Sequence, residues 1–562
     1  MIEKIYDIAK VYVKDLPFEK KLSQNLGRDK YLIVINLDEK KFEDLIFSEQ
    51  NENDEKILFY HKKGQYTISP SPSIYLQGND KEEKDKEVLK RLTEFFNHKK
   101  TKNIYQILKR DFDLIYSKIK EIDEKERKKL ALVVVAKENE EIKYPAEVKE
   151  IKEVFIERIM ENLNLSKKSF HKKCFLCGRE VESYPILNAV FKFSSFDKPG
   201  FTPVMSRNSA GISNICMDCF ADLKAARNFI NENLTFSFFG GGKLWIIPSG
   251  DPLGIKKVVN NITNIFSKKG RTTFANIERE LEETLSDEIS IHYDFVVLRI
   301  SNNEEKILLH IEDVSPSRIS QIHTTSKKIV NLEEFQTEKD IYDPTLKVFH
   351  NIISSGLKSE RNFLELVRCV YSEGRFSKDL FLNAAISWIR KNIFSQNVKN
   401  LLSSIVYSGK LAFSSYIFLS LLGVVGKGGE VVEKGSFFER YEKFFDAAWK
   451  KAVFLTGVLT GYILDFQQRE KGSTPFLKKL KGLKMRKEDV EGLLPEIKSK
   501  LMQYKIENEG TNRELERASK YFLEAGDWNA TVDEINFVFT IGMSMYRRFI
   551  RGEEDDDSEK QE

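Results

Sequence analysis

The stretch that decides the fold runs from Cys174 to Cys219 and contains two cysteine pairs. It begins Cys174-Phe-Leu-Cys177-Gly178 and ends Cys216-Met-Asp-Cys219, with 38 residues between the two pairs. Two residues between paired cysteines let a tight turn direct both thiolates at one ion, and four thiolates suit tetrahedral zinc. Gly178 fits the positive φ that such a turn often needs. The pattern predicts a split zinc ribbon whose halves are joined by an inserted loop.

Two other interpretations of the cysteine pairs are redox dithiols and disulfides. The chain is rich in lysine and shows no secretion signal, which favours a reducing compartment where thiols stay reduced. A catalytic zinc would keep an open position and usually recruits histidine or carboxylate. His171 could replace one cysteine, although a solvated histidine flanked by lysines is the simpler interpretation. We therefore expect a structural zinc site that holds the loop 179–215, with the ligands Cys174, Cys177, Cys216 and Cys219.

Length and composition predict a multidomain α+β protein. The 562 residues and the hydrophobic content of 41% allow several cores. Short apolar, β-branched runs alternate with amphipathic stretches in the first part, and helical patterns dominate the last part. The expected regions are a mixed α/β region at 1–165, a zinc-ribbon region at 166–235, a β-rich region at 236–340, a helical region at 341–422, a C-terminal four-helix bundle at 436–551 and an acidic disordered tail at 552–562.

The charge is unevenly distributed along the chain. The formal net charge is +4, but the tail 553–562 holds seven acids and one lysine, so the rest of the chain is clearly basic. A basic body suits a polyanionic partner, whereas the plain alternative is a charge-rich soluble protein with a disordered tail. The longest uncharged run, Leu411–Gly426, is too short for a bilayer and is expected to be a buried helix. We expect a cytoplasmic protein without a membrane partner.

A glycine-rich turn lies within Phe236-Ser-Phe-Phe-Gly-Gly-Gly-Lys-Leu-Trp-Ile-Ile-Pro248. Three glycines allow a phosphate to approach the backbone, and Lys243 follows as a cation. The plain alternative is an ordinary hairpin turn. A phosphate-binding P-loop is excluded at Gly426-Lys427-Gly428, because the glycine spacing is wrong and no Ser or Thr follows the lysine.

The C-terminal part is expected to be a four-helix bundle that carries a basic loop. Its first helix is predicted over Phe437–Gln468, with Gly457 and Gly461 offering a groove for close helix packing. The following segment, Pro475-Phe-Leu-Lys-Lys-Leu-Lys-Gly-Leu-Lys-Met-Arg486, has five cations and no acid, so it could neutralise several phosphates. A solvated loop is the plain alternative.

Several of these features together resemble one protein family. The split zinc ribbon, the aromatic–Gly-Gly-Gly–Leu-Trp-Ile-Ile-Pro segment, the block 475–485 and the stretch Val532-Asp-Glu-Ile-Asn-Phe-Val-Phe-Thr-Ile-Gly-Met543 look like the large subunit of a type I-B CRISPR interference (Cascade) complex. The first 165 residues are less diagnostic of this family.

The resemblance implies a non-catalytic subunit of an RNA-guided DNA surveillance complex. Such a subunit contacts the 5′ end of the CRISPR RNA and the backbone subunit, and it senses the motif that flanks the double-stranded DNA target. It also helps to open the duplex and presents the complex to a helicase-nuclease, while base pairing reads the target. The C-terminal bundle resembles the separate small subunit that lines the displaced strand.

Several residues suit contacts with nucleic acid. Arg and Asn can pair with base edges, lysines can hold phosphates and an aromatic ring can stack on a base. Ser209 adds a polar donor to the loop 179–215 between the cysteine pairs. The residues expected to bind nucleic acid are Arg207, Asn208, Asn214, Lys243, Lys256, Lys257, Phe476, Lys478, Lys479, Lys481, Lys484 and Arg486.

The alternatives are a metal-dependent nuclease and a zinc-ribbon regulator that binds nucleic acid. Metal nucleases need clustered carboxylates, often with histidine. Asp251, Asp294 and Asp313 lie near predicted strand ends but form no recognisable set, and the seven histidines are scattered. No helix-turn-helix stands out to support a regulator. We therefore expect no enzymatic activity in this chain.

Overall fold

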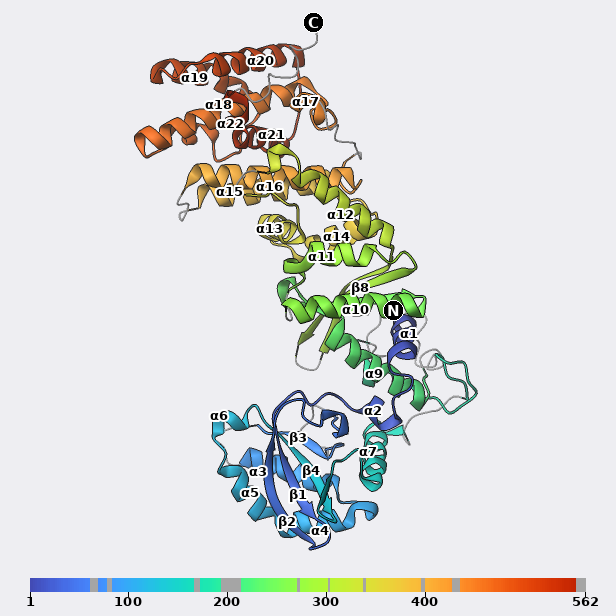
Figure 1. Ribbon diagram of the computed structural model, residues 1–562. Coiled ribbons are helices and arrows are strands. Elements are labelled where there is room, and N and C mark those ends of the chain that lie inside the picture. Colours follow the sequence, from blue (N-terminus) through green and yellow to red (C-terminus); the bar gives the residue numbers. More distant parts are fainter. Residues whose placement is uncertain are drawn as a thin grey trace. The chain divides into compact units, whose positions relative to one another are not determined.

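The computed structural model describes residues 1–60, 69–77, 83–165, 172–193, 214–269, 273–301, 304–336, 340–395, 400–426 and 435–551. Residue contacts divide the chain into two compact units (Figure 1). The first unit comprises Met1–Thr235, Trp245–Thr263 and Leu298–Ile307, and the second comprises Phe236–Leu244, Asn264–Val297 and Leu308–Glu562. The predicted acidic tail, 552–562, lies outside the described residues.

The first unit contains a mixed sheet built on two apolar runs of the sequence. Its path has the order β2-β1-β4-β3, and β5 pairs with β4. The β1 strand runs parallel to β4 and antiparallel to β2, while β3 and β5 are antiparallel to β4. The strands are β1 (Lys30–Asn36), β2 (Lys41–Ser48), β3 (Ser73–Tyr75), β4 (Ala131–Glu138) and β5 (Glu141–Lys143).

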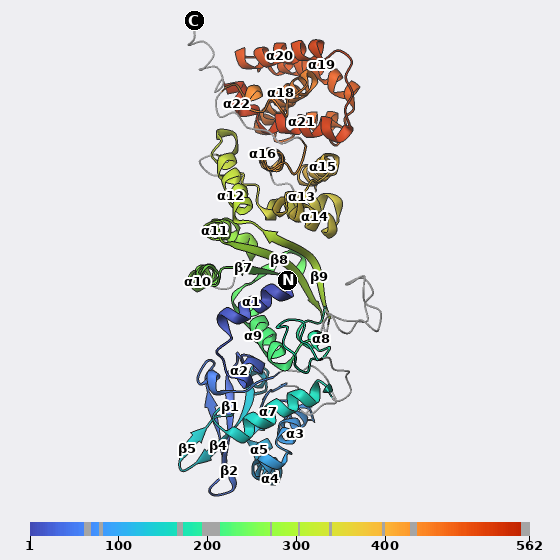
Figure 2. The same cartoon turned by 90° about the vertical axis from the view of Figure 1, so that its right-hand side faces the viewer.

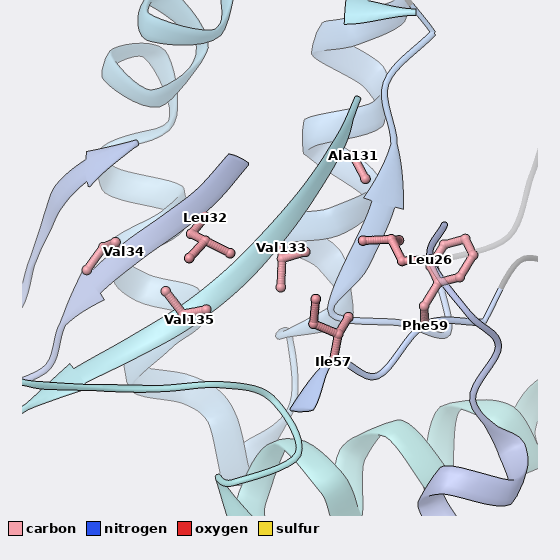
Figure 3. Close-up of a cluster of buried hydrophobic side chains, with 8 residues drawn as sticks. All are labelled: Leu26, Leu32, Val34, Ile57, Phe59, Ala131, Val133 and Val135. Atoms are coloured by element: carbon pink, nitrogen blue, oxygen red, sulfur yellow. The ribbon is translucent and has the colours of Figure 1, made fainter. Parts of the chain in front are cut away.

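The two central strands are buried on both faces. Leu32 lies opposite Val133, and Val34 lies opposite Val135. These side chains form a core with Ile57 and other apolar residues (Figure 3). The surrounding helices are α3 (Glu83–Phe95), α4 (Lys102–Arg110), α5 (Phe112–Lys120), α6 (Glu124–Arg127) and α7 (Lys149–Asn162). Continuous β-branched runs thus form buried central strands, as the sequence predicts.

The N-terminal helices pack on a helix that begins at the second cysteine pair. Both α1 (Ile2–Tyr12) and α2 (Phe18–Leu22) contact α9 (Met217–Asn233). The rings of Tyr12 and Phe229 stack with their centroids 4.3 Å apart, and Asn228 donates to the carbonyl of Ser23 over 3.2 Å. The start of the chain is therefore held against the segment that carries the cysteines.

A second sheet follows α9 and has the order β6-β7-β8-β9. Its strands are β6 (Thr235–Phe238), β7 (Gly242–Gly250), β8 (Ile291–Ser301) and β9 (Glu304–Val314). The connection between β7 and β8 contains α10 (Pro252–Lys269) and α11 (Phe274–Ser286). The strands β8 and β9 are consecutive in the sequence and adjacent in the sheet.

The second unit is dominated by helices after residue 315. The described helices are α12 (Pro316–Val330), α13 (Leu346–Leu357), α14 (Glu360–Tyr371), α15 (Lys378–Phe394), α16 (Leu401–Leu421), α17 (Phe437–Arg440), α18 (Ala448–Lys471), α19 (Lys487–Tyr504), α20 (Glu509–Ala525), α21 (Val532–Ser544) and α22 (Tyr546–Arg551). Helix α18 contacts α19, α20, α21 and α22, so it is the central helix of the C-terminal part (Figure 2).

Most of the uncharged run Leu411–Gly426 lies in α16, where residues 411–419 are all buried. The helix ends at Leu421, and Gly426 is exposed. None of the helices in the described residues combines the length and apolar character that a membrane crossing requires.

The single helix predicted over Phe437–Gln468 is wrong. Helix α17 ends at Arg440, and α18 begins only at Ala448. The residues between them include Phe444 and Phe445, which lie 5.2 Å from Phe413 and 5.8 Å from Phe437, respectively, measured between ring centroids. Neighbouring side chains of a helix point about 100° apart. The break therefore lets two consecutive rings join one aromatic cluster.

Glycines allow α18 and α21 to cross closely, as the sequence predicts for Gly457 and Gly461. A Cβ atom added at Gly457 would lie 2.1 Å from the carbonyl oxygen of Phe539, and one at Gly542 would lie 2.0 Å from that of Phe454. Both obstacles are backbone atoms, so no side-chain rotation could relieve the clash.

Replacing Gly542 with Ala should lower the free energy of unfolding by about 2 kcal/mol, because overpacking forces the two helices apart. Gly492→Ala is the matched control, since nothing lies within 4 Å of a Cβ at that helical position. The control should leave stability unchanged or raise it by about 0.5–1 kcal/mol. Chemical denaturation measures both values, and equal stability of the two variants would contradict close backbone packing.

A buried charged cluster joins α11 to the segment before α13. Arg279 donates to Glu282 over 2.7 Å and to Asp343 over 2.7 Å. The Glu278 carboxylate accepts the Leu346 backbone N–H, with both oxygens 3.0 Å away. Burial raises the pKa of Glu278 to about 8, although Arg279 opposes this shift. Glu278 therefore binds a proton more tightly in the folded protein than in the unfolded chain.

This raised pKa predicts a stability that falls as the pH rises. Between the unfolded value of 4.5 and about 8, the folded state holds more protons, so the free energy of unfolding decreases with pH. Glu278→Gln should raise the melting temperature relative to wild type at pH 9 more than at pH 5. The exposed Glu283→Gln on the same helix is the control and should show no such difference. An equal difference in melting temperature between Glu278→Gln and wild type at both pH values would contradict the raised pKa of Glu278.

Candidate metal centre and nucleic-acid interface

The four predicted zinc ligands converge. One sulfur from each of Cys174, Cys177, Cys216 and Cys219 lies within 4.8 Å of all the others, and all four cysteines are free thiols. The sulfurs of Cys177 and Cys216 are 3.9 Å apart. Zinc–sulfur bonds of about 2.3 Å place the sulfurs of a tetrahedral site about 3.8 Å apart. The cluster therefore has the size and donor set of a four-thiolate zinc site, and it contains no disulfide.

The first cysteine pair lies on a tight turn. Gly178 donates its N–H to the carbonyl of Cys174 over 3.0 Å, and the Cys174 N–H donates to the carbonyl of Arg179 over 3.0 Å. Gly178 has a φ of +69°, and nothing lies within 4 Å of a Cβ built there. The glycine is therefore required by its backbone conformation and not by lack of space.

Backbone pairing brings the second half of the ribbon back to the first. Tyr184 and Ile215 exchange two backbone hydrogen bonds of 3.0 Å, and Phe175 N–H donates to the carbonyl of Asn214 over 2.9 Å. Cys216 immediately precedes α9, and Cys219 lies in its first turn. These backbone contacts, which resemble strand pairing, thus bring the two cysteine pairs together despite their separation in the sequence.

Arg179 contacts the cysteine cluster, and this contact is not among the sequence predictions. Its Nε donates to Cys177 Sγ over 3.3 Å, and its Nη2 lies 3.8 Å from Cys216 Sγ. The same nitrogen pairs with Asp218 over 2.9 Å. Four thiolates around a divalent zinc carry two net negative charges, so a guanidinium that touches two sulfurs stabilises them. An arginine after the knuckle glycine is the only sequence signal for this role.

The N-terminal helix also reaches the cluster. The Tyr6 hydroxyl lies 3.5 Å from Cys219 Sγ. Because α1 packs along α9, this contact ties the start of the chain to the second cysteine pair.

The loop between the cysteine pairs holds the predicted base-reading residues. Arg207, Asn208 and Ser209 fall in 194–213, outside the described residues. Asn214 is fully buried, and its amide atoms have no hydrogen-bond partner in the described part of the chain. The contact of Asn214 with nucleic acid therefore stays a prediction, and in this structure the side chain is buried.

The glycine-rich turn joins β6 to β7. Gly240 and Gly241 have φ values of +64° and +74°. Phe239, beside them, stacks on His350 with the ring centroids 4.7 Å apart. This geometry is that of the plain hairpin connection, with Lys243 exposed at the start of β7. Lys256 and Lys257 are exposed on α10 and belong to the first unit, whereas Lys243 belongs to the second.

The basic segment 475–486 is anchored by buried groups of the C-terminal helices. Asn536 accepts the Met485 N–H over 3.2 Å and donates to the Met485 carbonyl over 2.9 Å. Gln467 accepts the Phe476 N–H over 3.0 Å, and Arg390 donates to the Leu483 carbonyl over 2.7 Å. The segment is therefore a fixed loop and not a loose tether. We call it the basic loop.

The cations of the basic loop point outward, and some are paired. Lys479 lies 3.1 Å from Glu496, and Lys481 lies 2.6 Å from Asp489. Both acids belong to α19, so they lie outside the sequence of the basic loop and its composition does not reveal them. The cations with no ion pair among the described residues are Lys478, Lys484 and Arg486, all exposed.

The stacking role expected of Phe476 stays a prediction. Its side chain is only 3% exposed, so the ring is buried in this structure.

Sequence reasoning missed one polar group that could hold a metal. Asp294, on β8, lies 2.9 Å from His310 Nε2 on β9, and Glu312 lies 3.3 Å from His310 Nδ1. Asp294 is fully buried and also accepts the Asp313 N–H over 3.1 Å. Pairing of β8 with β9 assembles this group. Both nitrogens of His310 already face carboxylates, so the group also satisfies itself as a set of ion pairs.

Replacing Cys174 and Cys216 with Ser should abolish bound zinc and lower the melting temperature, because structural zinc binding contributes to folding free energy. Elemental analysis of the purified protein measures the metal, with one zinc per chain expected for wild type. Cys369→Ser is the control, since Cys369 is a buried free cysteine outside the cluster. Unchanged zinc content in the double variant would contradict the assignment.

Two family models match the chain. The central domain of CRISPR-associated protein TM1802 (cas_TM1802) matches residues 171–314, and the C-terminal domain of the same family matches residues 344–557. The first range contains the cysteine cluster, and the second contains the basic loop. No curated protein matches the chain significantly. Together the two matches cover well over half of the sequence, and the chain is thus a CRISPR-associated protein with the central and C-terminal domains of the TM1802 family.

Proposed function

We propose that this protein is the non-catalytic large subunit of a type I-B CRISPR interference complex. In this role it contacts the 5′ end of the guide RNA, senses the motif that flanks the DNA target and holds the displaced strand. Its protein partners are the backbone and small subunits and a recruited helicase-nuclease, in the cytoplasm. The observation that supports this proposal most directly is an anchored basic loop within the matched C-terminal domain.

The basic loop suits a nucleic-acid backbone for electrostatic reasons. Buried Phe476, Leu480, Leu483 and Met485 fix the segment, while the cations between them stay in solvent. A fixed loop loses little conformational entropy when it binds, so the charge contacts contribute more of their energy to affinity. Three unpaired cations can contact three phosphates without first breaking an ion pair.

The zinc-held region is the proposed site for reading the flanking motif. The cluster fixes both ends of the loop that contains Arg207 and Asn208. Arg can pair with guanine and Asn with adenine in the major groove. Lys243, Lys256 and Lys257 are proposed to contact phosphates, since all three are exposed.

One observation supports a second candidate, a metal-dependent nuclease. Asp294, His310 and Glu312 offer two carboxylates and an imidazole within 4.8 Å of one another. Such a site would show manganese- or magnesium-dependent cleavage of DNA by the isolated chain, lost in Asp294→Asn. Absence of cleavage by wild type under these conditions removes this candidate.

Reversing the three unpaired cations of the basic loop, as Lys478→Glu, Lys484→Glu and Arg486→Glu together, should weaken binding of single-stranded DNA by the full-length protein. The slope of log K against log salt should fall by about 2, because each lost phosphate contact removes roughly 0.7. Fluorescence anisotropy over a salt series measures both quantities.

The matched control reverses Lys498, Lys505 and Lys520, which are exposed elsewhere on the same helical region. This variant has the same net charge as the loop variant. An equal loss of affinity in both variants would show a non-specific charge effect and would overturn the assignment to the basic loop.

A further inference from the structure

A buried lysine in the first unit has no role in the site described so far. Lys224 lies on α9, five residues after Cys219, and its side chain is only 7% exposed. Its ammonium sits 3.9 Å from the centroid of the Tyr60 ring. In the described part of the chain, no carboxylate pairs with it. A cation–aromatic contact alone does not replace the hydration that burial removes.

The neighbouring charges are already committed to other partners. Arg227, one turn further along α9, donates to Glu305 and to the carbonyl of Val190. Asp222, on the same helix, pairs with Lys21 over 2.9 Å. In the part of the chain that the structure describes, Lys224 therefore faces a second cation, and no carboxylate is shown to pair with it. Burial, together with the charge of Arg227, lowers the pKa of Lys224 to about 7.

A second unpaired donor lies beside Arg227. The guanidinium carbon of Arg227 is 5.9 Å from the centroid of the Trp245 ring. Trp245 is fully buried, and its indole N–H has no acceptor among the described residues. Within the described residues, the Trp245 indole N–H thus adds a donor without an acceptor to a region that already holds the cations of Lys224 and Arg227.

We propose that Lys224 is the anchoring cation of an anion site that takes a phosphate group, with Tyr60 forming one wall. Phosphate supplies several acceptor oxygens and no obligatory donor, so it matches a donor-rich site. A buried ammonium that lacks a partner destabilises the free protein by its desolvation, and a bound phosphate removes that penalty. The phosphate belongs either to a nucleic-acid strand or to a free anion. This inference does not depend on the basic loop.

The test compares full-length wild type with Lys224→Met and Lys224→Arg, and with exposed Lys347→Met as the charge control. Without ligand, Lys224→Met should melt at a higher temperature than wild type, because it removes a buried charge while keeping the volume. Inorganic phosphate should raise the melting temperature of wild type, of Lys224→Arg and of the control, but not of Lys224→Met. If Lys224 only supported the fold, its replacement by Met would not both raise the melting temperature and abolish the stabilisation by phosphate.

The second arm identifies the source of the phosphate. Two single-stranded RNAs of one sequence, with a 5′-phosphate or a 5′-hydroxyl, are titrated by anisotropy. Lys224→Met should weaken binding at least about tenfold, the effect of one charged hydrogen bond. A loss confined to the 5′-phosphorylated RNA assigns a terminal phosphate, and an equal loss with both assigns an internal one. Phosphate stabilisation and RNA affinity that match wild type in Lys224→Met would overturn the proposal.

Discussion

The structure depends most on the convergence of four cysteine sulfurs at one point. Four thiolates at this spacing would repel one another strongly, so a bound cation such as zinc would stabilise them. The cluster fixes the turn at Gly178 and the start of α9, and through Tyr6 it also contacts α1. Arg179 adds a positive charge from outside the cluster. One centre therefore positions the N-terminal helix, the helix that carries Lys224 and both ends of the inserted loop.

In the C-terminal part, one set of side chains anchors the basic loop and another set is available to bind nucleic acid. Apolar and amide side chains hold the backbone of the basic loop, while lysine and arginine side chains extend into solvent. This division explains why a single segment can be both rigid and strongly charged. The close crossing of α18 and α21 has a related effect, because the glycines there leave Asn536 of α21 positioned against the loop.

Local patterns in the sequence predicted the parts whose signals lie within a few residues. The cysteine cluster follows from cysteine spacing, the central strands from β-branched runs, and the glycine crossing from Gly457 and Gly461. Features that need tertiary contacts were missed or misjudged. The break before α18 depends on an aromatic cluster, and the partners of Lys479 and Lys481 come from a following helix.

The same limit applies to the candidate sites. Asp294, His310 and Glu312 meet only because β8 pairs with β9, so their spacing along the chain reveals nothing. A stacking role for Phe476 is predicted because an aromatic residue stands among cations, whereas the structure buries its side chain. That Lys224 pairs with no carboxylate among the described residues is likewise visible only once α9 is packed.

Site-specific photo-crosslinking tests the central claim most directly. A photoreactive residue would replace Lys478 in the protein, and the complex would be assembled with its guide RNA and a labelled DNA target. The account predicts crosslinks to the displaced strand from position 478 and few from position 498, which lies elsewhere on the same helical region. If position 478 gave no crosslinks to DNA in a fully assembled, target-bound complex, the account would be contradicted.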